Sequence, residues 1–248
     1  MIARLAGLRA HRPLFKSAFL VLGLAAVTTC GGGGGGGSDA YVVNLSTPAV
    51  HFTAREYDPL PATQTVHATY TGDGMVVGFP QGSPIPGWLA VDAVQGAGKS
   101  VDVHLQPSTT FMSHPGPPPY EYTSAFRFVT GKSDMTHLTT VDLPVTYTVT
   151  KGLVITTTPI NAVASQGSSA LGSPFDLGLL ASEGCTWTIT TDQPWMGPSM
   201  SSGSGSPVGV NLTVSAANLT PGTYQGTVTV QTTDGTIVRT LVVHLTVS

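Results

Sequence analysis

Charged residues are scarce in this 248-residue chain, where they make up 9% of the total. Runs of Glu, Lys, Leu and Ala, from which helices are usually built, are missing as a result. Gly, Thr, Ser and Val are abundant instead, a bias that suits short strands and turns. The composition therefore predicts an all-β protein. Since a β-sandwich domain takes about 100 residues, the length favours two such domains.

Basic clusters are also missing once the N-terminal segment is set aside. Four of the ten basic residues lie in residues 1–16, which we expect to be removed, namely Arg4, Arg9, Arg12 and Lys16. The mature chain then keeps six basic residues against thirteen acidic ones, a net charge of −7. A protein that binds phosphate backbones needs clustered Lys and Arg, so we expect no nucleic-acid partner.

No apolar run is long enough to cross a bilayer as a helix. The longest one, residues 17–27, has eleven residues and follows the four positive charges. A spanning helix needs about 20 residues, whereas a signal-peptide core has this shorter length. Residues 1–29 are therefore predicted to be a signal peptide.

The segment Val27-Thr28-Thr29-Cys30 resembles the lipobox of bacterial lipoproteins. The resemblance implies that Cys30 is acylated and becomes the mature N-terminus. Because Gly31 follows it in place of Asp, the resemblance also implies an outer-membrane lipoprotein of the cell envelope. Thr29 is bulkier than the usual Gly, Ala or Ser, and a secreted or periplasmic protein cut near Thr29 is the alternative.

Seven glycines, Gly31–Gly37, follow Cys30. Glycine has no side chain with which to pack, so residues 30–40 should form a flexible coil that spans roughly 15–20 Å. Such a coil suits a tether between a membrane anchor and the first domain.

The rest of the chain contains an internal repeat. Val43–Pro48 matches Val154–Pro159 at an offset of 111, and Trp88 matches Trp195 at an offset of 107. Further matches are Val101, Val103 and Leu105 with Val208, Val210 and Leu212 (offset 107), Tyr122, Phe126 and Phe128 with Tyr224, Val228 and Val230 (offset 102), and residues 145–149 with 243–247 (offset 98). The offset falls where the first copy has extra turn-like residues, as duplicated folds tolerate.

Apolar residues in both copies alternate with polar ones, as in Val208, Val210, Leu212 and Val214. This period of two indicates half-buried strands, about seven in each copy. We therefore predict two tandem immunoglobulin-like antiparallel β-sandwiches, residues 41–151 and 152–248, which meet near Lys151-Gly152 and bend little.

Parts of the second copy resemble the BACON domain. They are Cys185–Ile189, Pro194–Met196, Ser201–Gly205, Val210–Asn218 and Gly226–Val230. The resemblance implies an immunoglobulin-like fold, an extracytoplasmic setting and a lean toward carbohydrate. The first copy is more divergent, with Thr69-Tyr70 near the place of Cys185-Thr186-Trp187.

The three tryptophans could form a platform for sugar rings or fill the cores. Trp88, Trp187 and Trp195 occupy strand positions that face inward in the alternating pattern, so we expect them in the cores. Cys185, the only thiol besides Cys30, should pack as a small apolar residue.

We expect no enzymatic activity, no cofactor and no metal. Neither a Gly-x-Ser-x-Gly elbow nor a phosphate-binding loop occurs, although the fold could still bring two distant carboxylates together. The histidines after the signal peptide lack the spacing of a zinc site; they are His51, His67, His104, His114, His137 and His244.

The proline-rich segment 114–122 is the sharpest candidate for ligand contact. Its prolines predict an extended loop that presents Tyr120, with Tyr122 close behind, at one end of the first sandwich. Two functions stay open: a structural or protein-interaction module of the cell envelope, and a surface protein that binds polysaccharide.

Overall fold

The computed structural model describes residues 41–248 apart from 84, 109–116, 135, 169–173 and 208. The signal peptide, Cys30, the glycine tether and His114 lie outside the described residues. Strands are the only regular elements in the described part, and none of its segments is a helix that could cross a membrane. The chain is thus all-β where it is described, as its composition predicts.

The first sandwich has two four-stranded sheets, with strand orders β1-β3-β6-β5 and β2-β8-β7-β4. Its strands are β1 (Val43–Leu45), β2 (Val50–Arg55), β3 (Gln64–Tyr70), β4 (Gly74–Gly78), β5 (Leu89–Gln95), β6 (Ser100–Pro107), β7 (Tyr120–Gly131) and β8 (Thr139–Thr150). Side chains from both sheets, such as Val103 of β6 and Phe128 of β7, share one core. The first sheet has the A-B-E-D order of immunoglobulin domains and β8-β7-β4 has the G-F-C order, so the fold is immunoglobulin-like.

The second sandwich repeats this scheme with shorter strands. Its strands are β9 (Leu153–Ile155), β10 (Ile160–Ala164), β11 (Phe175–Asp176), β12 (Leu179–Ala181), β13 (Thr186–Thr191), β14 (Met196–Pro198), β15 (Ser202–Ser204), β16 (Asn211–Val214), β17 (Gly222–Thr232) and β18 (Val238–Val247). One sheet has the order β10-β18-β17-β13-β15, and two fragments, β12-β9 and β11-β16-β14, lie opposite it. Gly178, at a φ of 56°, interrupts what would be one continuous strand from β11 to β12.

Strand pairing departs from the antiparallel prediction at one edge of each sandwich. β2 pairs with β8 in parallel, and β10 pairs with β18 in parallel. In each copy the chain crosses from one sheet to the other after a proline, Pro48 or Pro159, without reversing direction. β2 and β10, which follow these prolines, therefore run alongside the last strand of their domain, β8 or β18.

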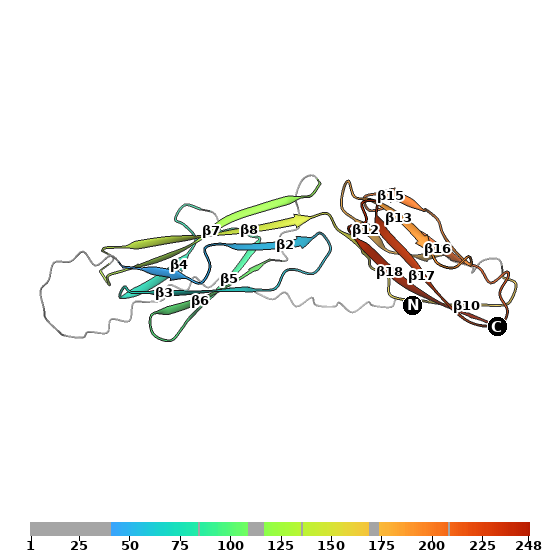
Figure 1. Ribbon diagram of the computed structural model, residues 1–248, viewed down its shortest axis with the longest axis horizontal. Coiled ribbons are helices and arrows are strands. Elements are labelled where there is room, and N and C mark those ends of the chain that lie inside the picture. Colours follow the sequence, from blue (N-terminus) through green and yellow to red (C-terminus); the bar gives the residue numbers. More distant parts are fainter. Residues whose placement is uncertain (1–40, 84, 109–116, 135, 169–173, 208) are drawn as a thin grey trace, which may run out of the picture.

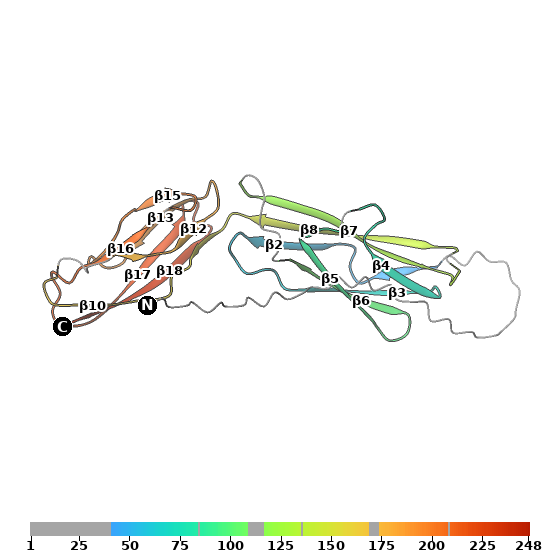
Figure 2. The same cartoon turned by 180° about the vertical axis from the view of Figure 1, so that it is seen from behind.

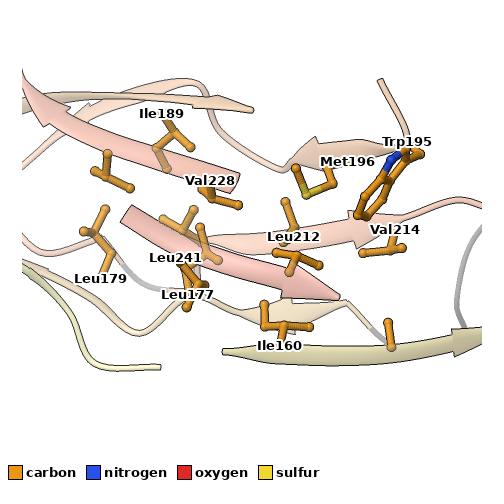
Figure 3. Packing of buried hydrophobic residues seen from close by; sticks show 14 of the residues in the cluster. Ile160, Leu177, Leu179, Ile189, Trp195, Met196, Leu212, Val214, Val228 and Leu241 are labelled. Carbon is orange, nitrogen blue, oxygen red and sulfur yellow. The ribbon is translucent and has the colours of Figure 1, made fainter. Parts of the chain in front are cut away.

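Alternation of buried and exposed side chains holds along the strands, as the period of two predicts. In the second sandwich Leu212 and Val228 are fully buried and pack with Ile160, Leu177 and Leu241 (Figure 3). Val208, the first residue of the predicted series, lies outside the described residues. Burial of these apolar faces, at about 25 cal/mol per Å², is the main stabilising contribution to each sandwich.

The two copies show the same register in their longest hairpins. Tyr122 faces Tyr147 in the first copy, and Tyr224 faces Leu245 in the second. In addition, the Ser108 amide donates to the Trp88 carbonyl oxygen at 2.6 Å, and the Ser215 amide donates to that of Trp195 at 2.9 Å. The offsets 107, 102 and 98 are thus confirmed as structural equivalences.

The sequence match at an offset of 111 is wrong by one residue. Val50 and Ile160 occupy the same register against the last strand, facing Val145 and Val243, so the offset there is 110 and not 111. A slip of one residue turns every side chain to the other face, which would have placed Asn161 in the core. In the first copy the place of Cys185-Thr186-Trp187 lies a few residues after Thr69-Tyr70, because the counterpart of Trp187 is Met75: Met75 faces Thr130 and Trp187 faces the equivalent Thr232.

The sandwiches lie end to end (Figures 1 and 2). Tyr41 enters at the far end of the first sandwich, where its carbonyl oxygen accepts a hydrogen bond from Thr139 at the start of β8. β8 then leads to the second sandwich, and β18 runs from the junction between the sandwiches to Val247 at the opposite end of the second one. The described part of the chain therefore begins and ends at opposite ends of an elongated molecule.

Candidate functional site at the junction of the sandwiches

Only Lys151 and Gly152 separate the last strand of the first sandwich from the first strand of the second. The Gly152 amide donates to Ser182 Oγ at 2.7 Å, and the Ser182 amide donates to the Gly152 carbonyl oxygen at 3.0 Å. A Cβ at position 152 would overlap the backbone carbonyl of Glu56. The two-residue connection is therefore packed from both sides, and a residue larger than glycine does not fit.

Arg239 of β18 joins the two sandwiches directly. Its Nε donates to the Leu153 carbonyl oxygen at 3.0 Å, and its Nη2 donates to Asp58 Oδ1 of the first sandwich at 2.7 Å. Both side chains of the ion pair are 30% exposed, so water screens it only in part. We call Gly152, Ser182, Arg239 and Asp58 the junction clamp.

A cleft of about 360 Å³ opens beside the junction clamp. The first sandwich lines it with Arg55, Pro119, Thr150 and Lys151. The second sandwich lines it with Gly184, Cys185, Thr186, Thr232, Thr233, Asp234, Thr236 and Ile237. Hydrogen bonds also cross it, from Lys151 Nζ to the Gly184 carbonyl oxygen at 2.8 Å and from Arg55 Nη2 to that of Thr236 at 3.4 Å.

Asp234 occupies the β17–β18 turn on the second side of the cleft. Its Oδ1 accepts hydrogen bonds from the Thr232 hydroxyl at 2.5 Å and from the Thr236 amide and hydroxyl at 3.0 and 2.9 Å. The Thr232 hydroxyl, followed by the Thr236 groups, lowers the pKa of Asp234 from 3.8 to about 2. The carboxylate thus stays ionised at ordinary pH and is directed into its own turn.

Cys185 lines the cleft but is only 3% exposed. Burial is the main cause that raises the pKa of its thiol, because the apolar surroundings disfavour a thiolate. It packs in the core of the second sandwich, as expected for a small apolar residue. A buried, protonated thiol is a poor nucleophile.

The structure separates the two tyrosines of the proline-rich segment. Tyr120 opens β7, faces Val149 and is half-buried near the junction. Its pKa is raised, first by burial and then by the negative charges of Glu56 in the first sandwich and Glu183 in the second. Tyr122 lies instead beside two buried rings, 6.0 Å from Trp88 and 5.9 Å from Tyr147 between ring centroids. Residues 114–116 of the predicted loop lie outside the described residues.

The tryptophans are in the cores, which confirms that prediction. Trp88 is 6% exposed, Trp187 is 0% exposed and Trp195 is 7% exposed. Trp187 also satisfies its polar atom, since Nε1 donates to the Gly205 carbonyl oxygen at 2.9 Å. Exposed indole faces for stacking on sugars are therefore not offered by these three residues.

Three of the described histidines form pairs with side chains on neighbouring strands. His67 contacts Asp102 at 2.7 Å, His104 contacts Thr65 at 2.8 Å and His51 contacts Thr146 at 2.5 Å. Within the described residues, no three His, Cys, Asp or Glu side chains gather in a way that could hold a metal ion. These histidines take part in cross-strand pairs on the surface of the first sandwich.

Sequence reasoning did not identify the junction clamp or the cleft. The boundary at Lys151-Gly152 was visible, but Arg239 and Asp58 are 181 positions apart. No local pattern marks such a pair. Only the two-residue connection between β8 and β9 could have suggested that the second sandwich would contact the end of the first.

No family model and no curated protein matches the chain. Among solved structures, cadherin domains 1–4 of protocadherin gamma B7 are 12% identical with a TM-score of 0.37, over 85% of this chain and 51% of that one. The D00-D0 domain of intimin is 12% identical with a TM-score of 0.34, over 82% and 99%. An endo-fucoidan hydrolase of glycoside hydrolase family 107 is 15% identical with a TM-score of 0.30, over 83% and 28%.

The chain thus spans about half the length of the protocadherin structure. At these scores the similarities carry no argument about function. The immunoglobulin-like assignment rests on the strand order of the two sandwiches.

Proposed function

We propose that this chain is a non-enzymatic structural or protein-interaction module of the bacterial cell envelope, and that it works as a stiff spacer. The observation that carries this proposal is the junction clamp. A flexible linker would let two domains move independently, whereas a two-residue connection with a bridging arginine favours one relative orientation.

The dimensions suit a spacer. β8 has twelve residues and β18 has ten, and at about 3.4 Å per residue they extend about 40 and 34 Å. Because β8 leads to the junction and β18 leads away from it, the two lengths follow one another along the molecule. A membrane anchor at one end would therefore hold the other end roughly 70 Å away.

The anchor in this proposal is Cys30, acylated after removal of residues 1–29 and joined to Tyr41 by the glycine tether. The lipid on Cys30 would place the far end of the first sandwich next to an outer membrane, with the second sandwich pointing away. In keeping with its sequence resemblance, we propose the second sandwich as a BACON-type domain and the first as a divergent copy.

Acyl labelling in cells tests the anchor. Cells that express the chain are fed a labelled fatty acid and then fractionated. We expect label and membrane association in the unchanged chain and in Cys185→Ala, and loss of both in Cys30→Ala. Cys185→Ala is the matched control, because it removes the other cysteine. Label that survives in Cys30→Ala, or an unchanged chain that is free of membrane, would overturn the anchor.

Small-angle X-ray scattering tests the spacer. The unlipidated Cys30→Ala chain should give the maximum dimension of two sandwiches held end to end. Inserting a six-residue Gly-Ser linker between Lys151 and Gly152 should broaden the pair-distance distribution, since it releases the domains without touching either core. Identical scattering from both proteins would show that the junction does not fix the orientation.

A further inference from the structure

The cleft beside the junction clamp is lined by two positively charged side chains that form no ion pair with a described carboxylate. Six Lys and Arg residues follow the glycine tether. In the part of the chain that the structure describes, two of them form ion pairs with carboxylates, Arg127 with Asp142 and Arg239 with Asp58. Arg55 and Lys151, which both line the cleft, do not appear in such pairs. The cleft therefore holds two of the four remaining cations of an acidic protein.

These two cations keep most of their donors available. A guanidinium has five N–H groups, and Arg55 uses Nη2 in one long contact of 3.4 Å to the Thr236 carbonyl oxygen. An ammonium has three, and Lys151 uses one toward Gly184 at 2.8 Å. The contacts hold both side chains over the cleft without neutralising them.

The opposite wall adds a hydroxyl donor and little competing acceptor capacity. Thr186 and Thr233 share one hydrogen bond of 2.5 Å between their hydroxyl oxygens, so one of the two hydroxyl hydrogens is left for another partner. Among the described residues that line the cleft, Asp234 is the one carboxylate, and its Oδ1 already accepts three hydrogen bonds from the turn. Counting Arg55, Lys151 and Asp234, the lining carries a net charge of +1.

We propose that this cleft is a binding site for a small oxyanion group, a carboxylate or a phosphate. Arg55 supplies the planar fork that matches two oxygens of such a group, Lys151 supplies a point charge, and the Thr186–Thr233 pair supplies a neutral donor. The cleft, at about 360 Å³, is large enough for the molecule that bears the group.

Binding here would reach beyond a passive spacer. Arg55 and Lys151 belong to the first sandwich, whereas the threonine pair belongs to the second. An oxyanion that contacts both sides adds links across the junction, and a ligand that binds only the folded, clamped arrangement stabilises that arrangement. The site does not depend on membrane anchoring, so it can be tested on the unlipidated chain.

The test is an NMR titration of the isotope-labelled Cys30→Ala chain with inorganic phosphate and, separately, with acetate. Sodium chloride at matched ionic strength is the reference. We expect saturable shifts of the Gly184, Thr186 and Thr233 amides with at least one of the two anions, and none with chloride. The stronger of the two responses identifies the group as phosphate or carboxylate.

Substitutions make the test specific. Arg55→Gln and Lys151→Gln should each weaken binding about tenfold, because each removes a charge-assisted hydrogen bond. Lys151→Arg, which keeps the charge, should retain binding. Lys132→Gln, which removes the same charge at an exposed turn of the first sandwich, should match the unchanged chain.

Three outcomes would overturn the site. They are the lack of a saturable shift with either anion, equal affinity in Arg55→Gln and Lys132→Gln, and shifts that spread over both sandwiches and follow ionic strength alone. Acyl labelling of Cys30 and the scattering experiment would be unaffected by any of them, so failure of the site and failure of the spacer are separable.

Discussion

The two sandwiches share one strand order but fill their cores in different ways. The first places its bulk on strands β2 and β7, where Phe52, Phe126 and Phe128 are buried. At the equivalent positions the second has Ala162, Val228 and Val230. In exchange it has Trp187 on β13, where the first has Met75.

This difference shows that the fold requires a filled core and does not prescribe which strand fills it. Interiors pack at a nearly constant density, so bulk lost on one strand has to be recovered on another. Three phenylalanines and a methionine in one copy therefore correspond to small residues and one tryptophan in the other. Gly203 shows the local consequence, since a Cβ there would collide with the Trp187 ring.

The largest effect is expected from Trp187→Ala. It empties the centre of the second core and leaves the Gly205 carbonyl oxygen without its donor, so the free energy of unfolding should fall by about 3–5 kcal/mol. Denaturant unfolding followed by near-ultraviolet circular dichroism would show this. Met75→Ala, at the equivalent position, should lower the free energy of unfolding by less. Equal losses would refute the idea that Trp187 supplies in the second core the volume that the phenylalanines supply in the first.

Phe128→Val comes next, because it gives the first core the side chain that the second has at this position. The cavity should cost about 2–4 kcal/mol in the first sandwich, measured by chemical denaturation. The reverse change, Val230→Phe, should destabilise the second sandwich by about 1–3 kcal/mol through overpacking. If either substitution left the free energy of unfolding unchanged, each core would tolerate the other core's side chain at this position, and the account of two differently packed cores would be wrong.

Arg239→Ala compares the junction with the cores. It removes the ion pair to Asp58 and the donor to the buried Leu153 carbonyl oxygen, and should cost about 1–2 kcal/mol. Calorimetry should show the second sandwich melting earlier, with little change in the first. Lys99→Ala, which removes an exposed Lys of the first sandwich, is the control. An equal loss of stability in Lys99→Ala would show that the contacts of Arg239 across the junction add nothing beyond the loss of a surface cation.

The smallest effect concerns the two aspartate turns. Asp134 and Asp234 both accept hydrogen bonds from a threonine two residues on, and both have a lowered pKa. A carboxylate with a lowered pKa stabilises the fold above its unfolded pKa, and this contribution is lost as the pH falls. The stability difference between the unchanged chain and Asp234→Ala should therefore be constant above about pH 5, shrink as the pH falls through about 4, and lose its ionisation-dependent part below about pH 2. A difference that grows in acid would contradict this assignment.

Periodicity and repetition were sufficient to predict most of the fold. The alternation of Tyr224, Gly226, Val228 and Val230 gives the register of the long hairpins, because a strand has only two faces. The parallel edge strands were missed, since alternation is the same in either strand direction. The place of Cys185-Thr186-Trp187 in the first copy was put near Thr69-Tyr70, a few residues before Met75, because bulk had moved between strands, which no position-by-position match can follow.

The junction was less predictable for a different reason. Tyr120 was expected at the end of the first sandwich, and it does lie at the end that meets the second. Yet its neighbours, Glu56 and Glu183, come from segments far apart in the chain. Contacts between domains depend on how two finished surfaces meet, and a sequence pattern within either one carries little of that information.

The distance between spin labels on either side of the junction tests the stiff-spacer account most directly. Labels at Thr53→Cys and Thr240→Cys, both exposed, would be placed in a Cys30→Ala, Cys185→Ser chain and measured by pulsed electron paramagnetic resonance. The account predicts one narrow distance distribution that broadens in Gly152→Ala, where the added methyl group displaces Glu56. A broad distribution in the chain with Gly152 intact would contradict it.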